Sequence, residues 1–263
     1  MKKKKSFDKF AVISILSVVG FFFGWWLITD GLHLVRAVIL PSPVTVAKAF
    51  AVKLVNRNPD GGLLIEHIGT SLQVALSGYI TGISIGLPLG VLMAWYPTFD
   101  KFYRPIFNLI RPISPIAWIP IMILWFGIGL GSKTAMIFLS AFVPSVINAY
   151  AGIKSANQVH YWVAQTFGAK RKVLLFKVAI PSAMPFFFTG MKVSLGNAWM
   201  SLVAAELLAA TRGLGYMIQL NRMLGRVENI VVGMLTIGAL GALFAVTLDL
   251  IEKKLVKGGA KRD

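Results

Sequence analysis

The chain has 263 residues, of which 56% are hydrophobic and only 14% charged, and its formal net charge is +17. The charged fraction is far below the roughly 25% of an ordinary soluble domain, which excludes that class. The Lys and Arg residues lie in short clusters between long apolar runs, so we expect a lipid bilayer and no nucleic acid as the partner of this charge. With no cysteine and three isolated histidines, the sequence offers no disulfide, thiolate nucleophile or metal-ligand spacing.

The apolar runs predict an all-α, polytopic membrane protein with about six transmembrane helices. A spanning helix needs about 20 apolar residues, because unpaired backbone groups are not tolerated in lipid. The first run follows four lysines as in a signal peptide, but it is too long and lacks a small-residue cleavage pattern, so we interpret it as a retained span. The predicted spans are residues 10–28, 70–95, 112–130, 134–153, 186–205 and 230–248.

The positions of the 27 Lys and Arg residues predict the orientation. If the N-terminus is inside, most of them fall in cytoplasmic segments, as the positive-inside rule requires. An even number of spans then places the C-terminus in the cytoplasm as well. The whole chain, residues 1–263, is predicted to form a single transmembrane domain.

The segment of residues 41–64 lies outside the membrane in this arrangement. Ser42 or Thr45 is placed to cap a helix whose apolar face carries Val46, Phe50 and Leu54. Its mixed charge and apolar spacing favour a helix that lies on the membrane surface.

The cytoplasmic segment of residues 155–181 predicts two short helices. Val159, Trp162, Val163 and Phe167 recur at helical spacing, and Gly168 then ends the first helix. A second helix is expected over residues 173–178, stopped by the proline at position 181. Periodicity alone leaves two interpretations open: a basic hairpin that lies on anionic lipid headgroups, or an element that docks a partner protein.

The residues of this segment resemble a known family. Ala164-Gln-Thr-Phe-Gly168, nine residues and then Val178-Ala-Ile-Pro181 is similar to the cytoplasmic motif of binding-protein-dependent ABC importer permeases, although Trp162-Val163-Ala164 stands where the family has Glu-Ala-Ala. The segments RPISPIAWIP (111–120), IMILWFGIG (121–129), LVAAE (202–206), TRGLGY (211–216) and LPSP (40–43) resemble the nitrate, sulfonate and taurine group of these permeases.

This resemblance implies the type I ABC importer permease fold in the bacterial cytoplasmic (inner) membrane. It also implies a second permease copy in a homodimer, an ABC ATPase dimer at the cytoplasmic face and an extracytoplasmic solute-binding protein. ATP and Mg would be held by the ATPase, because this chain has no Gly-Lys dipeptide for a phosphate-binding loop and needs no cofactor of its own. The chain itself would be a non-catalytic transport subunit.

By the same resemblance, the first short helix of the cytoplasmic segment would couple the permease to the ATPase. Gly168 is expected to allow close approach of the backbone. The predicted coupling residues are Val159, Trp162, Val163, Ala164, Phe167, Gly168, Ala169, Lys170 and Pro181.

The translocation pathway is predicted from polar, ionisable or helix-breaking residues in spans. Ionisable groups there are costly, so Glu206 is a gate candidate that could pair with Arg212, and Lys192 could face the ATPase or reach the interface. Small polar residues in spans also serve helix packing, which remains an alternative for each serine and asparagine. The candidates are Pro112, Pro115, Pro120, Ser140, Asn148, Asn197, Ser201 and Glu206.

Two other classes of protein compete with this interpretation. A secondary transporter would show inverted repeats and buried charges, and a membrane-embedded enzyme would need a clustered nucleophile and base; neither pattern is evident. The resemblance favours an oxyanion such as taurine, an alkanesulfonate or nitrate as the solute, with a vitamin precursor as the alternative.

Overall fold

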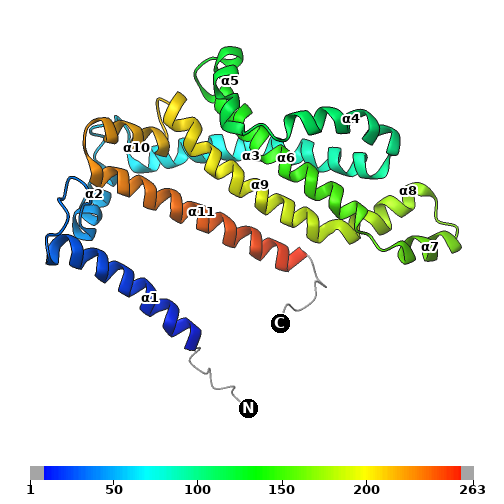
Figure 1. Cartoon of the computed structure of the whole chain (residues 1–263), viewed down its shortest axis with the longest axis horizontal. Coiled ribbons are helices and arrows are strands. Elements are labelled where there is room, and N and C mark those ends of the chain that lie inside the picture. The colour runs from blue at the N-terminus through cyan, green and yellow to red at the C-terminus, as the bar shows by residue number, and fades with distance from the viewer. Residues whose placement is uncertain (1–8, 256–263) are drawn as a thin grey trace. The chain divides into compact units, whose positions relative to one another are not determined.

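The computed structural model describes residues 9–255, and in that range every regular element is helical (Figure 1). The all-α fold class is therefore confirmed. The lysines at positions 2–5, on which the predicted orientation partly depends, lie outside the described residues, as do residues 256–263.

The helices follow one another with short connections. In chain order they are α1 (Lys9–Trp26), η1 (Leu27–Gly31), α2 (Pro43–Val55), α3 (Leu64–Trp95), α4 (Pro97–Ile110), η2 (Pro115–Trp118), α5 (Ile119–Phe126), α6 (Leu130–Lys154), α7 (Gln158–Thr166), α8 (Arg171–Leu174), η3 (Leu175–Ala179), α9 (Ile180–Ala209), α10 (Leu214–Met223) and α11 (Val227–Leu255).

Four stretches of the described chain are long and apolar enough to cross a bilayer. They are Leu64–Trp95, Leu130–Lys154, Arg171–Leu207 and Val227–Lys254. A fifth crossing results if α4 and the η2–α5 segment, which meet at 85°, form one broken span. The N-terminal apolar helix, Leu16–Gly31 in the searched part, is shorter. The chain is thus a multi-pass membrane protein.

The region of the predicted third span, whose prolines indicate a break, is broken. η2 has four residues and α5 has eight, so α5 is only about 12 Å long against a hydrocarbon core of about 30 Å. Pro115 and Pro120 each lie in the first turn of their helix, where the missing N–H costs no helical hydrogen bond. The prolines therefore start short helices at the break.

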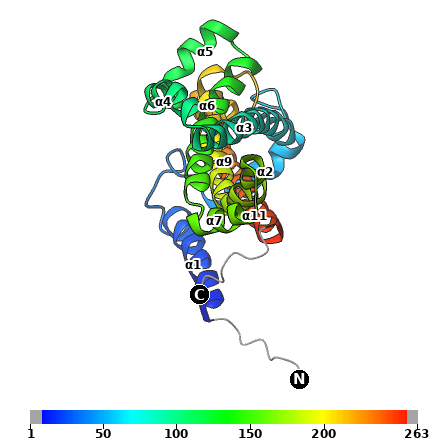
Figure 2. The ribbon, with the colours of Figure 1, turned by 90° about the vertical axis from the view of Figure 1, so that its right-hand side faces the viewer.

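The described residues divide into two compact units. One comprises residues up to Ile65 together with Met217–Thr236, and the other comprises Glu66–Tyr216 and the residues from Ile237 onward. In the second unit α6 and α9 lie side by side (Figures 1 and 2). The main apolar core of this unit is formed by Val74, Ala75, Tyr79, Ile137, Ala141, Leu195, Ala198, Trp199, Leu202 and Leu248.

A row of glycines lets α3 pack closely on α6. Gly78, Gly82, Gly86 and Gly90 recur every four residues, so they share one face of α3. A Cβ atom at Gly86 would lie 1.9 Å from the Oγ of Ser145, and the other three would also come within 3 Å of α6 atoms. Small residues at this spacing are the usual means of close helix packing in membranes.

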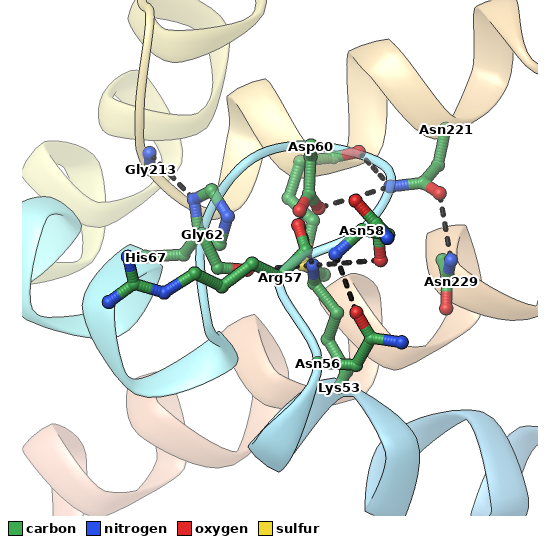
Figure 3. Close-up of polar contacts among 11 residues, drawn as sticks. Lys53, Asn56, Arg57, Asn58, Asp60, Gly62, His67, Gly213, Asn221 and Asn229 are labelled. Carbon is green, nitrogen blue, oxygen red and sulfur yellow. Dashed lines mark hydrogen bonds and ion pairs between the residues drawn. The ribbon is translucent and has the colours of Figure 1, made fainter.

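In the first unit, a buried ion pair fixes the segment after α2. Ser42 caps α2 by accepting a hydrogen bond from the backbone N–H of Thr45 at 3.3 Å, as predicted. Lys53, only 1% exposed, pairs with Asp60 and donates to the Gly62 carbonyl at 2.7 Å (Figure 3). The helix α2 thus carries a buried lysine in addition to its predicted apolar face, and the sequence analysis did not predict that this lysine is buried.

This ion pair extends into an amide chain. The second carboxylate oxygen of Asp60 lies 3.4 Å from the Nδ2 of Asn221, whose Oδ1 accepts a hydrogen bond from Asn229 at 2.8 Å (Figure 3). Both asparagines are buried. The network connects the loop after α2 to residues of α10 and α11 inside the same unit.

Candidate functional site

The helix α7 begins with a side-chain cap. Asn157 precedes it in an extended conformation, and its side-chain oxygen accepts a hydrogen bond from the N–H of Val159 at 2.9 Å. Such a cap satisfies one of the free N–H groups in the first turn. The predicted helix is present, with bounds Gln158–Thr166.

Gly168 ends α7 for a reason that differs from the predicted one. Its φ of +75° lies in the left-handed region, its N–H bonds the Gln165 carbonyl at 2.8 Å, and the N–H of Ala169 bonds the Ala164 carbonyl at 3.1 Å. This pair of bonds is the Schellman motif, which favours glycine at that position. A Cβ atom here would meet nothing within 4 Å, so the expectation of close backbone approach was wrong.

One face of α7 is apolar and uncovered in this chain. Val159, Trp162, Val163 and Phe167 are between 51% and 86% exposed, and no residue of α7 is buried. Three of these side chains lie on α7 and Phe167 directly follows it, and together they form an apolar patch that favours burial against another molecule. We call these four residues the α7 patch.

The opposite side of this segment is attached to the end of α3. The rings of Tyr161 and Trp95 lie 6.1 Å apart, and Arg171 donates to the Trp95 carbonyl at 3.1 Å. Arg171 also lies over the ring of Tyr96, 5.2 Å from its centroid. Partial burial raises the pKa of Tyr161. These contacts orient α7, so that the α7 patch is held on a fixed support.

The prediction that Pro181 stops the second helix was wrong. The chain is helical from Arg171 to Leu207, and residues Leu175–Ala179 form a π-helical turn just before the proline. A π turn shifts the hydrogen-bond partners by one residue, which accommodates the missing proline N–H without ending the helix. The cytoplasmic segment therefore runs directly into the span that contains α9.

Three of the predicted pathway residues meet at one hollow of about 150 Å³. Pro115, Ser140 and Asn197 line it, from η2, α6 and α9, together with Trp118 and Arg111 at the break after α4. We call it the elbow hollow. Arg111 was not among the predicted pathway residues, although its place beside three prolines in the sequence was a usable signal.

The remaining polar candidates serve packing. Ser140 donates a hydrogen bond to Ser201 at 2.7 Å, which connects α6 to α9. Asn148 donates to the Pro144 carbonyl at 2.9 Å and lies against Gly190. For Ser201 and Asn148, these contacts support the packing alternative. Pro112 lies in the turn between α4 and η2.

Glu206 is buried in a hydrogen-bond network that sequence reasoning missed. Its carboxylate accepts from the hydroxyl of Ser71 at 2.8 Å and from the backbone N–H of Gly215 at 2.8 Å. Ser71 in turn accepts from the N–H of Leu214 at 2.8 Å. The expected pairing with Arg212 was wrong, because the carboxylate points to α3 and to the turn before α10. No local pattern identifies Ser71, which is 135 positions away.

Lys192 also has partners within the chain. It forms ion pairs with Asp249 and Glu252, so it ties the middle of α9 to the C-terminal part of α11. A lysine held by two carboxylates does not need to reach the membrane interface to be solvated, and these contacts favour a structural role for it.

Comparison with known proteins identifies the family. Residues 86–258 match the family described as binding-protein-dependent transport system inner membrane component. The taurine transport system permease protein TauC of Escherichia coli K12 is 36% identical over 234 residues, covering 88% of this chain and 84% of that protein. The nitrate import permease protein NrtB of Leptolyngbya laminosa is 30% identical over 75% of this chain and 70% of that protein.

The fold agrees with a solved transporter. A chain of the inward-facing MetNI methionine ABC transporter superposes with a TM-score of 0.60 at 18% identity, covering 74% of this chain and 94% of that chain. This likeness shows the type I importer permease fold. The chain belongs to the family of binding-protein-dependent transport system inner membrane components, and is a multi-pass inner-membrane permease of the ABC importer class.

Proposed function

We propose that this chain is the membrane-spanning subunit of an ATP-driven importer, and that the α7 patch is its contact with a separate ATPase. The observation that carries the proposal is the exposure of Phe167, Trp162, Val159 and Val163 on a helix whose other side is fixed to α3. Apolar anchors that fill grooves on a partner dominate binding energy at interfaces. The basic residues Lys170 and Lys172 lie beside the patch and suit its rim.

The mechanism follows from this placement. The ATPase would bind ATP and Mg, and the permease chain would supply no catalytic residue or cofactor. Because the π turn joins α8 to α9 without a break, a displacement of α7 and α8 by the ATPase would be passed directly to the span of α9. Closing of the ATPase would thereby shift the equilibrium between inward-open and outward-open arrangements.

The remaining parts of the machinery also belong to the proposal. Residues 1–263 act as one permease domain with both termini in the cytoplasm, two copies form the pathway, and an external binding protein delivers the solute. The names of the taurine and nitrate relatives support a small oxyanion, such as taurine, an alkanesulfonate or nitrate. Pro115, Ser140 and Asn197, with Arg111, are the pathway residues that the elbow hollow supports best.

The test uses two variants of α7. Phe167→Ser removes the most exposed apolar side chain of the patch, whereas His160→Gln changes an exposed polar residue of the same helix. We expect Phe167→Ser to reduce co-purification of the ATPase subunit from native membranes and taurine-stimulated ATP hydrolysis by about tenfold or more, as for loss of an interface anchor. His160→Gln should behave as wild type. Full ATPase binding by Phe167→Ser, Trp162→Ser and the double variant would contradict the coupling role.

A further inference from the structure

The elbow hollow contains two polar groups without partners. Arg111 and Asn197 are both exposed, and within the described part of the chain no hydrogen bond or ion pair joins the guanidinium of Arg111 or the side-chain amide of Asn197 to another residue. By contrast, Arg104, two turns earlier on α4, is held by Asp100 and by the hydroxyl of Tyr150. Arg111 thus differs from Arg104, whose guanidinium is held by groups of the same chain.

The charge of the elbow hollow is positive. Arg111 is the charged residue of its lining, which contains no carboxylate, and its walls are otherwise apolar except for Ser140 and Asn197. Arg111 is exposed, so its guanidinium is accessible to an anion that enters the hollow. Guanidinium presents its N–H groups in a planar fork that matches two oxygens of an anion.

The size and place of the hollow suit a small solute in transit. Its volume of about 150 Å³ is below the roughly 300–1,000 Å³ of sites for drug-sized ligands. Arg111 also borders a second hollow of about 380 Å³, lined by Met93, Asn108, Val146 and Tyr150 among others. It thus stands where two hollows along α6 adjoin, at the 85° break between α4 and the next helices.

We propose that the elbow hollow is a transient binding site for a small oxyanion on its way through the permease, with Arg111 as the charge that holds the anion and Asn197 as a second donor. The proposal rests on the proposed function and adds the residue that selects for anions. Sulfonate oxygens on the solute and phosphate oxygens on a lipid headgroup share this chemistry. We commit to the solute, because Ser140 of α6 and Asn197 of α9, two of the predicted pathway residues, line the hollow.

The absence of cysteine from the sequence allows a direct test. A single Asn197→Cys variant would be purified, and its modification would be timed with two methanethiosulfonate reagents, one ending in ethylsulfonate and one in trimethylammonium. We expect the anionic reagent to react faster than the cationic one. In the same background, Arg111→Gln should lower the ratio of the anionic to the cationic rate by about tenfold, because a positive charge in a cleft raises the local concentration of anions. Lys101→Gln, a change of an exposed cation on the same helix, should leave the ratio unchanged.

Two further arms keep the proposal falsifiable. Ser140→Cys reports on the same hollow if Asn197→Cys does not fold, and an unchanged ratio in both backgrounds after Arg111→Gln would overturn the proposal. The measurement is repeated in vesicles of phosphatidylcholine and of phosphatidylglycerol. Equal ratios support a free anion, whereas loss of the ratio in phosphatidylglycerol would show that a lipid headgroup occupies Arg111 and would contradict the proposal.

Uptake of labelled taurine by the complete transporter separates this inference from the proposed function. Arg111→Gln should lower the maximal uptake rate by about tenfold or more, the effect of removing a charged hydrogen-bond donor. Arg111→Lys should retain part of it, and Lys101→Gln all of it. Normal uptake by Arg111→Gln beside an active wild type would overturn this inference alone. A wild type that imports neither taurine, an alkanesulfonate nor nitrate would overturn the proposed function.

Discussion

The buried pair of Lys53 and Asp60 gives the sharpest stability prediction. Lys53→Met keeps the apolar stem but removes the ammonium, so the Asp60 carboxylate, which is 0% exposed, and the Gly62 carbonyl lose their shared donor. Removing one partner of a buried ion pair costs about 3–5 kcal/mol, because the carboxylate stays buried after losing the ammonium group that it faced. For a chain of this size, that corresponds to a fall in Tm of about 6–20 °C.

The measurement is thermal unfolding of the detergent-purified protein, followed by tryptophan fluorescence. Lys48→Met is the matched control, since Lys48 is exposed on the same helix and should change the stability by less than about 0.5 kcal/mol. The reasoning also predicts non-additivity: Lys53→Met with Asp60→Asn should cost less than the sum of the two single changes, because the stranded charge is absent. Additive losses, or a Tm of Lys53→Met within 2 °C of wild type, would refute the argument.

Two glycines give further predictions. Gly168 is required for its positive φ and not for space. Gly168→Asn should therefore keep most of the uptake, because asparagine adopts this backbone conformation more readily than other side chains, whereas Gly168→Val should lose uptake through a strain of about 1–2 kcal/mol. Equal uptake by the two variants would contradict this argument. At Gly86 the requirement is space, so Gly86→Leu should lower the stability by at least about 1–3 kcal/mol in thermal unfolding. Gly69→Leu, on the same helix with no atom within 4 Å of its Cβ position, is the control.

The sequence was sufficient to predict features that depend on local spacing. Apolar runs identified four of the six predicted spans as membrane-length helices, while the first is shorter and the third is bent, and the spacing of Val159, Trp162 and Val163 identified one face of α7. The four-residue repeat of glycines on α3 was equally readable, but the sequence analysis considered glycine only in the cytoplasmic segment and not inside the spans. A repeat of small residues inside an apolar run is a packing signal that sequence reasoning can use.

Features that depend on long-range contacts could not be predicted in the same way. The partner of Glu206 is Ser71, far away in the sequence, and the proximity of Arg212 in the chain suggested the wrong pair. The helix through Pro181 continues because a π turn precedes it, and the turn has no local sequence signature. In both cases the outcome was decided by packing between helices, which residue spacing does not encode.

The charged groups of the described chain differ in whether they have hydrogen-bond or ion-pair partners in the same chain. Lys53, Lys192 and Glu206 are costly in an apolar setting, and each is satisfied by carboxylates, hydroxyls or backbone groups of the same chain. Such groups stabilise the fold and need no other molecule. Arg111 is different, because it lines a hollow and has neither an ion pair nor a side-chain hydrogen bond there.

The α7 patch resembles Arg111 in that its side chains, which are apolar, are also exposed. Its side chains are exposed among the described residues, and a patch of this kind favours burial against another molecule. Satisfied groups therefore mark the scaffold, and unsatisfied groups mark the two places where function needs another molecule. On this argument, changes at Arg111 should alter which solute passes, while changes at the α7 patch should alter how passage is coupled to ATP.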